Sequence, residues 1–342
     1  MGASWQKGRS VVDEIVRPPR PRRGDLVRVV SPSLPSLAYS RGVVDVPVAR
    51  LAAMGLRCDF APNAFEISDD GRSAGTAAQR AEDLHGAFLD PDVSVVMSAV
   101  GGLASHELLP HLDADLLRSH PTAFVGRSDN TFLNAFLYSR AGLTSFTGAS
   151  FVTQFGESDV PPETSRSVED VLLGSGPLRL ESSPVRTQNS VPASYAGEVH
   201  RWSGGRAGTD VWLQHGRSAG RLLGAEAGIL ADLLEAGLLD VTGSVLWLDV
   251  VDDGPEYAEE VLDRLWPLLE GVPVAALLVA DNPSLPFEDW TTQIGARLRE
   301  GGPRVNGPVM VGGDLGHYQP AWLLPYGEVV VVDAARGITI DR

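Results

Sequence analysis

The segment Gly126-Arg127-Ser128-Asp129 holds the serine whose surroundings best suit a nucleophile. It follows a short apolar run and precedes a helical pattern that begins at Thr131, which places Ser128 on a tight strand-to-helix turn. Such a turn exposes the hydroxyl, and the backbone N–H groups that follow can donate to an oxyanion. The spacing is not the Gly-x-Ser-x-Gly of nucleophile elbows. Capping of the next helix by Ser128 or Asp129 is the simpler explanation of the same residues.

His317 and a group of aspartates carry the complementary chemistry. His317 lies in the glycine-rich loop GGDLGHYQP, where an imidazole with a pKa near neutrality can act as a general base. Asp249, Asp252 and Asp253 follow an apolar run at 245–248, and an acid at the end of a buried strand can orient a histidine. A solvated loop histidine and an aspartate-rich turn are the ordinary alternatives.

Gly101 and Gly102 directly follow the apolar run at 93–100. A glycine pair at the carboxyl end of a strand lets the backbone approach a ligand closely, at the edge where open α/β sheets bind ligands. An ordinary glycine turn explains the pair equally well.

The single cysteine, Cys58, lies where a helical segment ends and a strand begins, which favours an inert buried thiol. The histidine spacings match no metal-ligand pattern, so neither a metal nor a cofactor is predicted.

The elements that must position these residues alternate between strand and helix. Over residues 25–150 this alternation predicts an α/β domain with a parallel sheet. The predicted strands of this domain are 26–30, 93–100 and 123–126, and its predicted helices are 48–54, 76–89 with Thr76 as N-cap, and 131–139. A later region holds predicted strands at 245–251, 274–279, 309–311 and 329–332, with a helix at 257–269.

The chain has 342 residues, which suggests about two domains. Proline, glycine and serine accumulate between the two patterned regions and indicate an interdomain connection. The predicted division is a flexible arm at 1–24, an N-terminal α/β domain with the nucleophile at 25–160, a linker at 161–200 and a C-terminal β/α domain at 201–342.

Lys and Arg total 28 against 44 Asp and Glu, a formal charge of −16. This balance argues against nucleic acid and against anionic membranes as partners. No apolar run approaches the length of a membrane span, and the N-terminus lacks the apolar stretch of a secretory signal. One cysteine cannot form an intramolecular disulfide, which is typical of a reducing compartment. The sequence therefore predicts a soluble cytoplasmic protein; the resemblance described next implies a small-molecule or short-peptide substrate.

Taken together and in order, these features resemble the serine LD-carboxypeptidase family, peptidase family S66, and within it the microcin-C-resistance peptidases. The resemblance spans nearly the whole chain after residue 24, and the Gly-x-Ser-Asp segment with its long flanks is its most specific part. It is carried by GDLVRVVSPS (24–33), AGTAAQRAEDLHGAFLDPDV (74–93), GG (101–102), LLPHLD (108–113), FVGRSDNTFLNAFLYSRAGLTSFTGASF (124–151), FGE (155–157), LWLDVVDD (246–253), GHYQP (316–320) and LPYGEVVVVD (324–333).

The resemblance implies a Rossmann-like N-terminal domain with the nucleophile and a swivelling C-terminal β/α domain with the other two triad members, within homodimers. It makes Ser128 the nucleophile and His317 the general base. The oxyanion donors would be the backbone N–H groups of Gly102 (or Gly101) and Asp129. No metal or cofactor is implied.

Two positions depart from the family pattern. The orienting acid is usually glutamate, whereas this chain has Asp249, which is one methylene shorter. To reach His317 it needs a small backbone shift or a bridging water, unless Asp252 or Asp253 replaces it. The family's Gly-Gly-Asn appears as Gly224-Ala225-Glu226, which points to a different substrate.

The implied activity is cleavage of an amide near a free carboxyl end through an acyl-enzyme. The substrate would be a muropeptide or a peptidyl- or aminoacyl-nucleotide-like compound. Candidate substrate-binding residues are Gly101, Arg127, Glu226 and Trp202, and packing in the core is the alternative for the tryptophan. Two other functions stay open: a biosynthetic acyltransferase that uses the same acyl-enzyme, and a catalytically weakened homologue that only binds.

Overall fold

The chain divides into two compact units. In this computed structural model, the described residues are 14–39, 44–156, 162–183, 185–186, 203–204, 210–251, 254–282, 284–317 and 320–340. The first unit comprises Met1–Gly174, Val191–His200 and Leu323–Tyr326, and the second comprises Ser175–Ser190, Arg201–Trp322 and Gly327–Arg342. The predicted linker at 161–200 begins with a helix, α6 (Pro162–Leu172), which belongs to the first unit.

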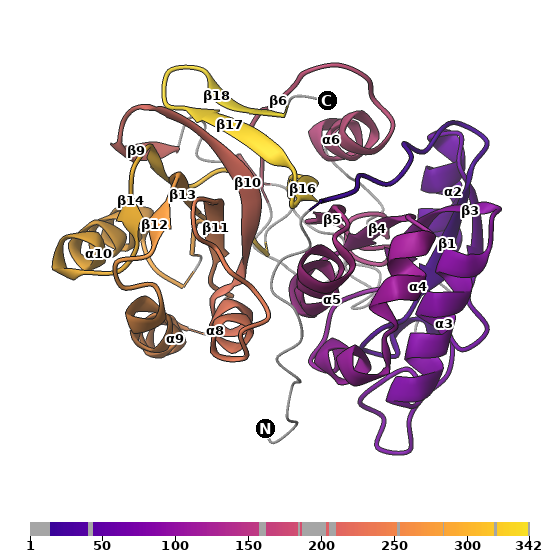
Figure 1. The fold of residues 1–342 in the computed structure, drawn as a ribbon. Helices are drawn as coiled ribbons and strands as arrows, with labels where there is room; N and C mark the ends of the chain where they lie inside the picture. Colours follow the sequence, from indigo (N-terminus) through magenta and orange to yellow (C-terminus); the bar gives the residue numbers. More distant parts are fainter. Residues whose placement is uncertain are drawn as a thin grey trace. The chain divides into compact units, whose positions relative to one another are not determined.

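The first unit is built on a six-stranded sheet with the order β16-β5-β4-β3-β1-β2 (Figure 1, indigo to magenta, with β16 in yellow). Its strands are β1 (Leu26–Val30), β2 (Arg57–Phe60), β3 (Val93–Ser98), β4 (Ala123–Gly126), β5 (Ser145–Thr147) and β16 (Leu324–Tyr326). All pairings are parallel except that of β16 with β5. Strands β1, β3 and β4 are almost wholly buried, which accounts for their mostly apolar sequences.

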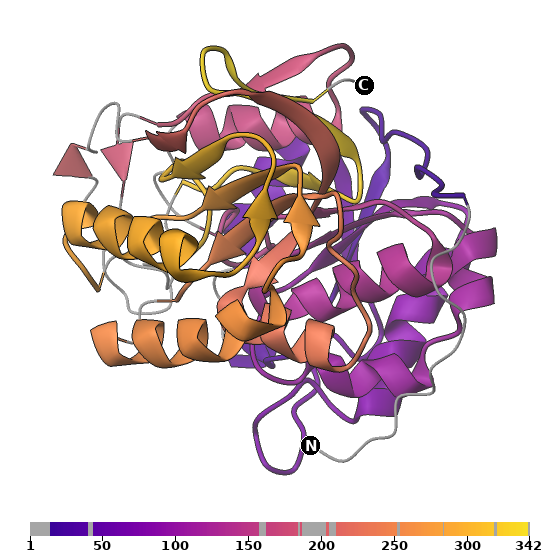
Figure 2. The same ribbon diagram turned by 60° about the vertical axis from the view of Figure 1, so that its left-hand side comes forward.

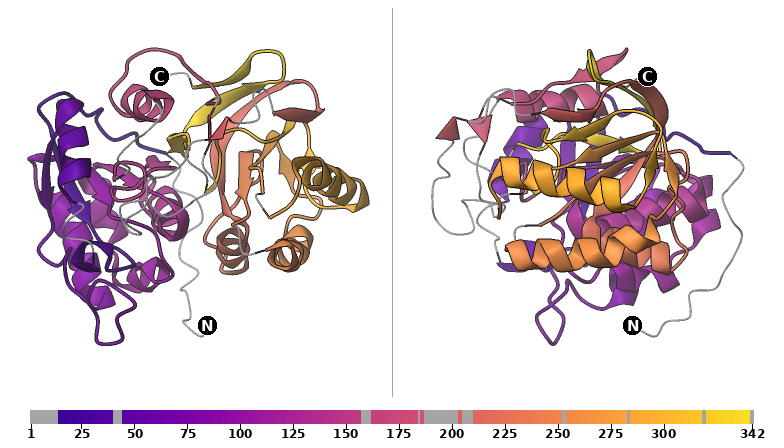
Figure 3. Two further views of the ribbon diagram at one scale, coloured as in Figure 1. Left: turned by 180° about the vertical axis from the view of Figure 1, so that it is seen from behind. Right: turned by 90° about the vertical axis from the view of Figure 1, so that its left-hand side faces the viewer.

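Helices connect these strands. They are α1 (Ser36–Tyr39), α2 (Asp45–Ala53), α3 (Ala77–Leu89), the 3₁₀ segment η2 (Ser105–His111), α4 (Ala114–Ser119), the 3₁₀ turn η3 (Ser128–Asn130), α5 (Thr131–Phe136) and the π-helical turn η4 (Leu137–Ala141). Thr76 is the N-cap of α3, as predicted, and it also forms a capping box with Gln79. Helix α3 packs on β1 and β3, and it lies beside α4 in Figures 1 and 3.

The second unit contains an eight-stranded mixed sheet with the order β6-β18-β17-β10-β11-β13-β15-β9. Its strands are β6 (Leu178–Leu180), β9 (Val211–Gln214), β10 (Arg217–Glu226), β11 (Val245–Asp249), β13 (Ala276–Val279), β15 (Val309–Val311), β17 (Val329–Asp333) and β18 (Gly337–Ile340). Strands β10, β11, β13 and β15 run parallel. Two small two-stranded sheets pair β12 (Pro273–Val274) with β14 (Arg304–Val305) and β7 (Val185–Arg186) with β8 (Ser203–Gly204).

Among the described residues of this unit, the helices are α8 (Ala227–Glu235), α9 (Pro255–Leu268) and α10 (Phe287–Glu300). Helices α9 and α10 run alongside each other in Figures 2 and 3. An ion pair of 2.7 Å between Arg297 and Asp263 links them. The expected fold class is confirmed, because the chain combines a parallel-stranded α/β unit with a second mixed α/β unit.

In both units the candidate site residues lie at the carboxyl ends of parallel strands or in the loops that follow them. In the first sheet the order reverses between β1 and β3, so the switch point lies between the segments that follow these two strands. The Leu34 N–H donates to the Gly101 carbonyl across this point at 3.3 Å. The sheet topology therefore brings the predicted glycine pair to the place where this architecture binds ligands.

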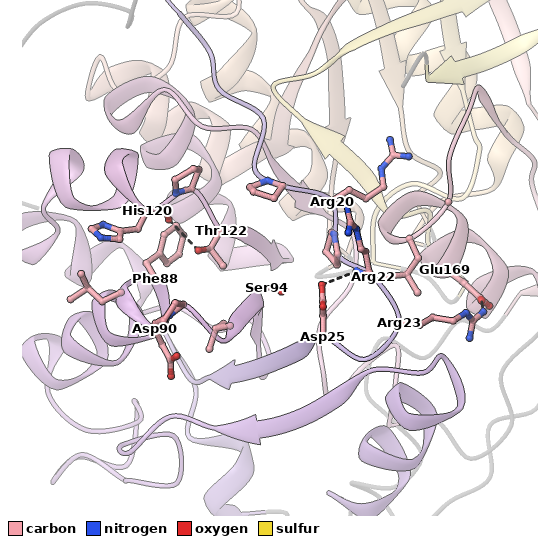
Figure 4. A pocket seen from close by; sticks show the side chains of 18 of the residues that line it. Arg20, Arg22, Arg23, Asp25, Phe88, Asp90, Ser94, His120, Thr122 and Glu169 are labelled. Carbon is pink, nitrogen blue, oxygen red and sulfur yellow. Dashed lines mark hydrogen bonds and ion pairs between the residues drawn. The ribbon is translucent and has the colours of Figure 1, made fainter.

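The opposite, amino edge of the first sheet borders a cavity of about 1210 Å³ (Figure 4). Its lining includes Arg22 and Asp25 before β1, Ser94 in β3, and His120 and Thr122 before β4. This hollow is thus at the edge away from Ser128.

Within the described part of the chain, no helix combines the length and the apolar character that crossing a bilayer requires.

Candidate active site

Ser128 sits on a strained strand-to-helix turn. Strand β4 ends at Gly126, and the 3₁₀ turn η3 begins with Ser128 and leads into α5. Its φ of +59° makes Ser128 the one non-glycine residue with positive φ in the described part of the chain. A left-handed conformation costs roughly 1–2 kcal/mol for a residue with a side chain. Ser128 is partly exposed between the buried Arg127 and Asp129, so the turn presents its hydroxyl as predicted.

The glycine pair approaches Ser128 closely. A Cβ on Gly101 would lie 2.8 Å from the Ser128 Cβ and 3.2 Å from the Arg127 carbonyl oxygen. Gly102 has φ of +149°, and a Cβ there would collide with Ser33 and Leu34. Both positions therefore require glycine: a side chain on Gly101 would collide with Ser128, and one on Gly102 would collide with the segment after β1. The predicted approach of this backbone to a ligand stays a prediction.

The Asp129 carboxylate fastens this loop to the serine turn. Its Oδ2 accepts hydrogen bonds from the N–H groups of Ala104 at 3.0 Å and Ser105 at 2.8 Å, at the start of η2. Within the described residues neither η3 nor α5 has a side-chain cap. The Asp129 side chain thus bonds to the start of η2, on the other side of the loop. A role for its backbone N–H in an oxyanion hole stays a prediction.

Asp249 and His317 form a hydrogen-bonded pair in the second unit. Asp249 is the last residue of β11, His317 lies in the loop after β15, and the imidazole Nδ1 is bonded to Asp249 Oδ2. Asp249 is 2% exposed, whereas 23% of the His317 side chain is accessible. Since an ionised carboxylate only accepts, Nδ1 carries the proton and Nε2 is the basic nitrogen. Asp249 thus reaches His317 directly, without a bridging water.

Gly316 explains how the shorter acid reaches the imidazole. Its φ is +82°, and a Cβ there would collide with Asp249 Oδ1 and lie 3.0 Å from the Ala280 Cβ. The backbone before His317 therefore rests directly on the carboxylate, which compensates for the missing methylene. The other two acids considered, Asp252 and Asp253, lie outside the described residues.

Gly316→Ala is expected to lower kcat about 10²-fold, because the new methyl group displaces the loop from Asp249. Gly271→Ala is the matched control. Gly271 also has a left-handed φ, +69°, but a Cβ there meets nothing within 4 Å. Steady-state kinetics and thermal melting of both variants separate the collision from the backbone strain that they share. Equal kcat in the two variants would show that contact with Asp249 is unimportant.

Glu226 lies beside this pair but bonds to other protein groups. It is the register partner of Asp249 in the neighbouring strand β10. Its Oε2 accepts the N–H groups of Gly228 at 2.9 Å and Ile229 at 3.1 Å, and the Tyr257 hydroxyl lies 3.1 Å from Oε1. Burial raises the pKa of Glu226, and the charge of Asp249 adds to this effect, while the two α8 N–H groups oppose it. Its predicted substrate contact stays a prediction.

The remaining predicted residues are less informative. Arg127 is buried, with 6% exposure, and its carbonyl accepts the Asn130 N–H at 3.2 Å. Trp202 lies outside the described residues.

The contact of Tyr257 with Glu226 was not predicted from the sequence. A tyrosine near the start of an amphipathic helix has no sequence pattern that distinguishes it from other tyrosines.

Cys58 is expected to be unreactive in the folded protein. Burial raises the pKa of its thiol to about 12, with a further contribution from the charge of Asp59. At pH 8 only about 10⁻⁴ of such a thiol is ionised, and the thiolate is the nucleophile. Iodoacetamide at pH 8 should therefore alkylate Cys58 slowly in the native protein and rapidly in urea, as measured by mass spectrometry. Rapid native alkylation would contradict an inert thiol.

The chain resembles carboxypeptidases in sequence and MccF-like proteins in fold. A family model described as the LD-carboxypeptidase N-terminal domain of peptidase family S66 matches residues 27–148. A murein tetrapeptide carboxypeptidase of Pseudomonas aeruginosa is 30% identical over 278 residues, 77% of this chain and 80% of that protein. A carboxypeptidase-named relative from Vibrio cholerae is 29% identical over 61% of this chain, and this chain spans 62% of its length.

The crystal structure of an MccF-like protein from Bacillus anthracis str. Ames superposes with a TM-score of 0.82. The two chains are 24% identical, and the match covers 95% of this chain and 99% of the other, so the whole two-unit fold is shared. Together with the family match over the serine-bearing domain and the 30% identity to the Pseudomonas enzyme, this establishes that the chain belongs to the LD-carboxypeptidase family, peptidase family S66.

Proposed function

We propose that this protein is a serine carboxypeptidase that cleaves an amide near a free carboxyl end through an acyl-enzyme. The observation that carries the proposal is the hydrogen bond from His317 Nδ1 to the buried Asp249. That bond fixes the tautomer in which Nε2 can accept a proton, as a general base must. The strained and partly exposed Ser128 supplies the hydroxyl that such a base would activate.

In the proposed reaction Ser128 Oγ attacks the amide carbonyl carbon, and its proton passes to His317 Nε2. The backbone N–H groups of Gly102 (or Gly101) and Asp129 stabilise the oxyanion. When the tetrahedral intermediate collapses, the C–N bond breaks and the leaving amine takes the proton from His317. Water then attacks the ester with His317 again as base, which releases the acid and restores the serine.

Two substrate classes deserve direct comparison. The Pseudomonas relative is named as a murein tetrapeptide carboxypeptidase, and a solved structure of MccF holds glutamyl sulfamoyl guanosine. We propose that this chain acts on a muropeptide or on a peptidyl- or aminoacyl-nucleotide compound. Glu226 replaces the amide side chain of the family pattern with a carboxyl group, which favours a substrate different from those of the relatives.

The test combines an active-site probe with a substrate panel. A fluorophosphonate should label the wild-type enzyme once, and chromatography should show amine release from a murein tetrapeptide or from an aminoacyl sulfamoyl adenosine. Labelling with product formed only when an acceptor amine is added would indicate an acyltransferase. The absence of both labelling and turnover would contradict the proposal and favour a binding protein.

A further inference from the structure

Arg80 is a buried cation that the proposed reaction does not use. It lies on α3, and only 1% of its side chain is exposed. Its Nη1 donates to the carbonyls of Pro32 at 2.6 Å and Ala104 at 2.9 Å, and its Nη2 pairs with Glu107. Burying a guanidinium costs free energy unless the group is ion-paired and hydrogen-bonded. The groups that Arg80 contacts therefore indicate which segments of the chain it holds in place.

Both carbonyls belong to segments at the carboxyl edge of the first sheet. Pro32 follows β1, and Ala104 follows β3 two residues after Gly102. Nη1 therefore spans the switch point and fastens one segment to the other. Glu107, the ion-pair partner of Arg80, has a side chain that is 49% exposed, so it lies on the solvent side of the guanidinium.

Ala104 is also held through its own N–H group. That group donates to Ser33 Oγ at 2.9 Å and to Asp129 Oδ2 at 3.0 Å. The N–H of Ser105 donates to the same Asp129 oxygen at 2.8 Å. The loop after the glycine pair is thus fixed at both its N–H and its carbonyl, and Arg80 provides the carbonyl contact.

We propose that Arg80 is the positioning residue for the loop formed by residues 101–105. Gly101 and Gly102 have no side chains to fix their backbone, and glycine has the widest choice of conformations. Besides the bond from the Leu34 N–H to the Gly101 carbonyl, the contacts that follow the pair, at Ala104 and Ser105, set the path of the loop. Arginine suits this task because its rigid fork reaches several acceptors at once, whereas lysine is a flexible point donor. The catalytic consequence rests on the proposed function, because these glycines would supply an oxyanion donor.

The test is Arg80→Lys, with Arg28→Lys as the matched control. Arg28 also binds two partners in the first unit, Asp59 and Asp90, and neither belongs to the loop. Hydrogen exchange resolved at the amides of Ala104 and Ser105 is the first readout. We expect about five- to tenfold faster exchange in Arg80→Lys, the effect of losing roughly one net hydrogen bond, and no change in Arg28→Lys.

Kinetics is the second readout. A loop displaced by about 1 Å costs on the order of 10²-fold in rate, so kcat should fall by that factor while KM stays within about twofold. If Arg80→Lys does not fold, Arg80→Gln replaces it, since it retains one donor without a buried charge.

Unchanged exchange at Ala104 and Ser105, or an unchanged kcat in an active enzyme, overturns the inference. A wild-type protein without turnover, whose amides still exchange faster in Arg80→Lys, would overturn the proposed function and leave the positioning role supported.

Discussion

Ser128→Ala is expected to abolish turnover, with kcat lower by about 10⁴-fold or more, because losing a nucleophile removes the acyl-enzyme route altogether. Substrate affinity should change little, since the methyl group of alanine fits where the Ser128 Cβ already lies. The fold should also persist, because the left-handed φ of +59° burdens serine and alanine alike.

The measurement is kcat together with intact-mass detection of the fluorophosphonate adduct. Ser31→Ala is the matched control, because Ser31 lies at the same edge of the sheet and its hydroxyl donates to the Ala64 carbonyl at 2.7 Å. That variant should keep both label and turnover. A Ser128→Ala protein that still acquires the adduct would place the nucleophile elsewhere and undo the proposed mechanism.

Asp249→Asn should lower kcat by about 10⁴-fold while leaving the fold intact. The asparagine amide can donate to His317 Nδ1, which moves the ring proton to Nε2, and a protonated Nε2 cannot accept the serine proton. Asp249→Ala tests the same contact by removing the carboxyl group. Wild-type turnover in Asp249→Ala would show that the assigned acid is wrong.

Asp249→Glu is the more stringent variant, because it introduces the glutamate that the resemblance to the S66 family leads us to expect at this position. The close approach of Gly316 to Asp249 Oδ1 leaves no room for another methylene. We therefore expect Asp249→Glu to remain at least about 10²-fold below wild type, since the displaced imidazole is misaligned. Full activity in this variant would mean that the loop after β15 moves to accept the longer side chain. The pH dependence of kcat/KM in the variant would report the new environment of His317.

Local patterns in the sequence predicted much of the framework. The strands at 26–30, 123–126 and 309–311 have the predicted bounds, because short, mostly apolar segments of this length suit strands buried on both faces. Thr76 begins α3 as predicted, since a capping box is formed by residues three positions apart. The expected strand at 93–100 ends earlier, at Ser98. Beyond it the Ala99 N–H bonds to the Val30 carbonyl as the chain turns toward the glycine pair.

Other elements departed from their local pattern. The helix predicted at 131–139 changes to a π-helical turn at Leu137 and ends at Gly142, which adopts the left-handed conformation. Strand β16 was not predicted, because Leu324–Tyr326 is short and contains a proline. It forms because it can pair antiparallel with β5 at the edge of the first sheet.

The sequence by itself determined the candidate set: a serine on a turn, a glycine pair after a strand, an acid that ends a strand and a histidine between glycines. The tertiary structure decided which acid reaches the histidine. Asp249 and His317 lie far apart in the chain, and their contact depends on the order of β11, β13 and β15 and on the close approach of Gly316. The contacts of Arg80 with Pro32 and Ala104, and of Tyr257 with Glu226, likewise appear only in three dimensions. Periodicity reports which face of an element is buried, whereas strand order and loop path decide which distant side chains meet.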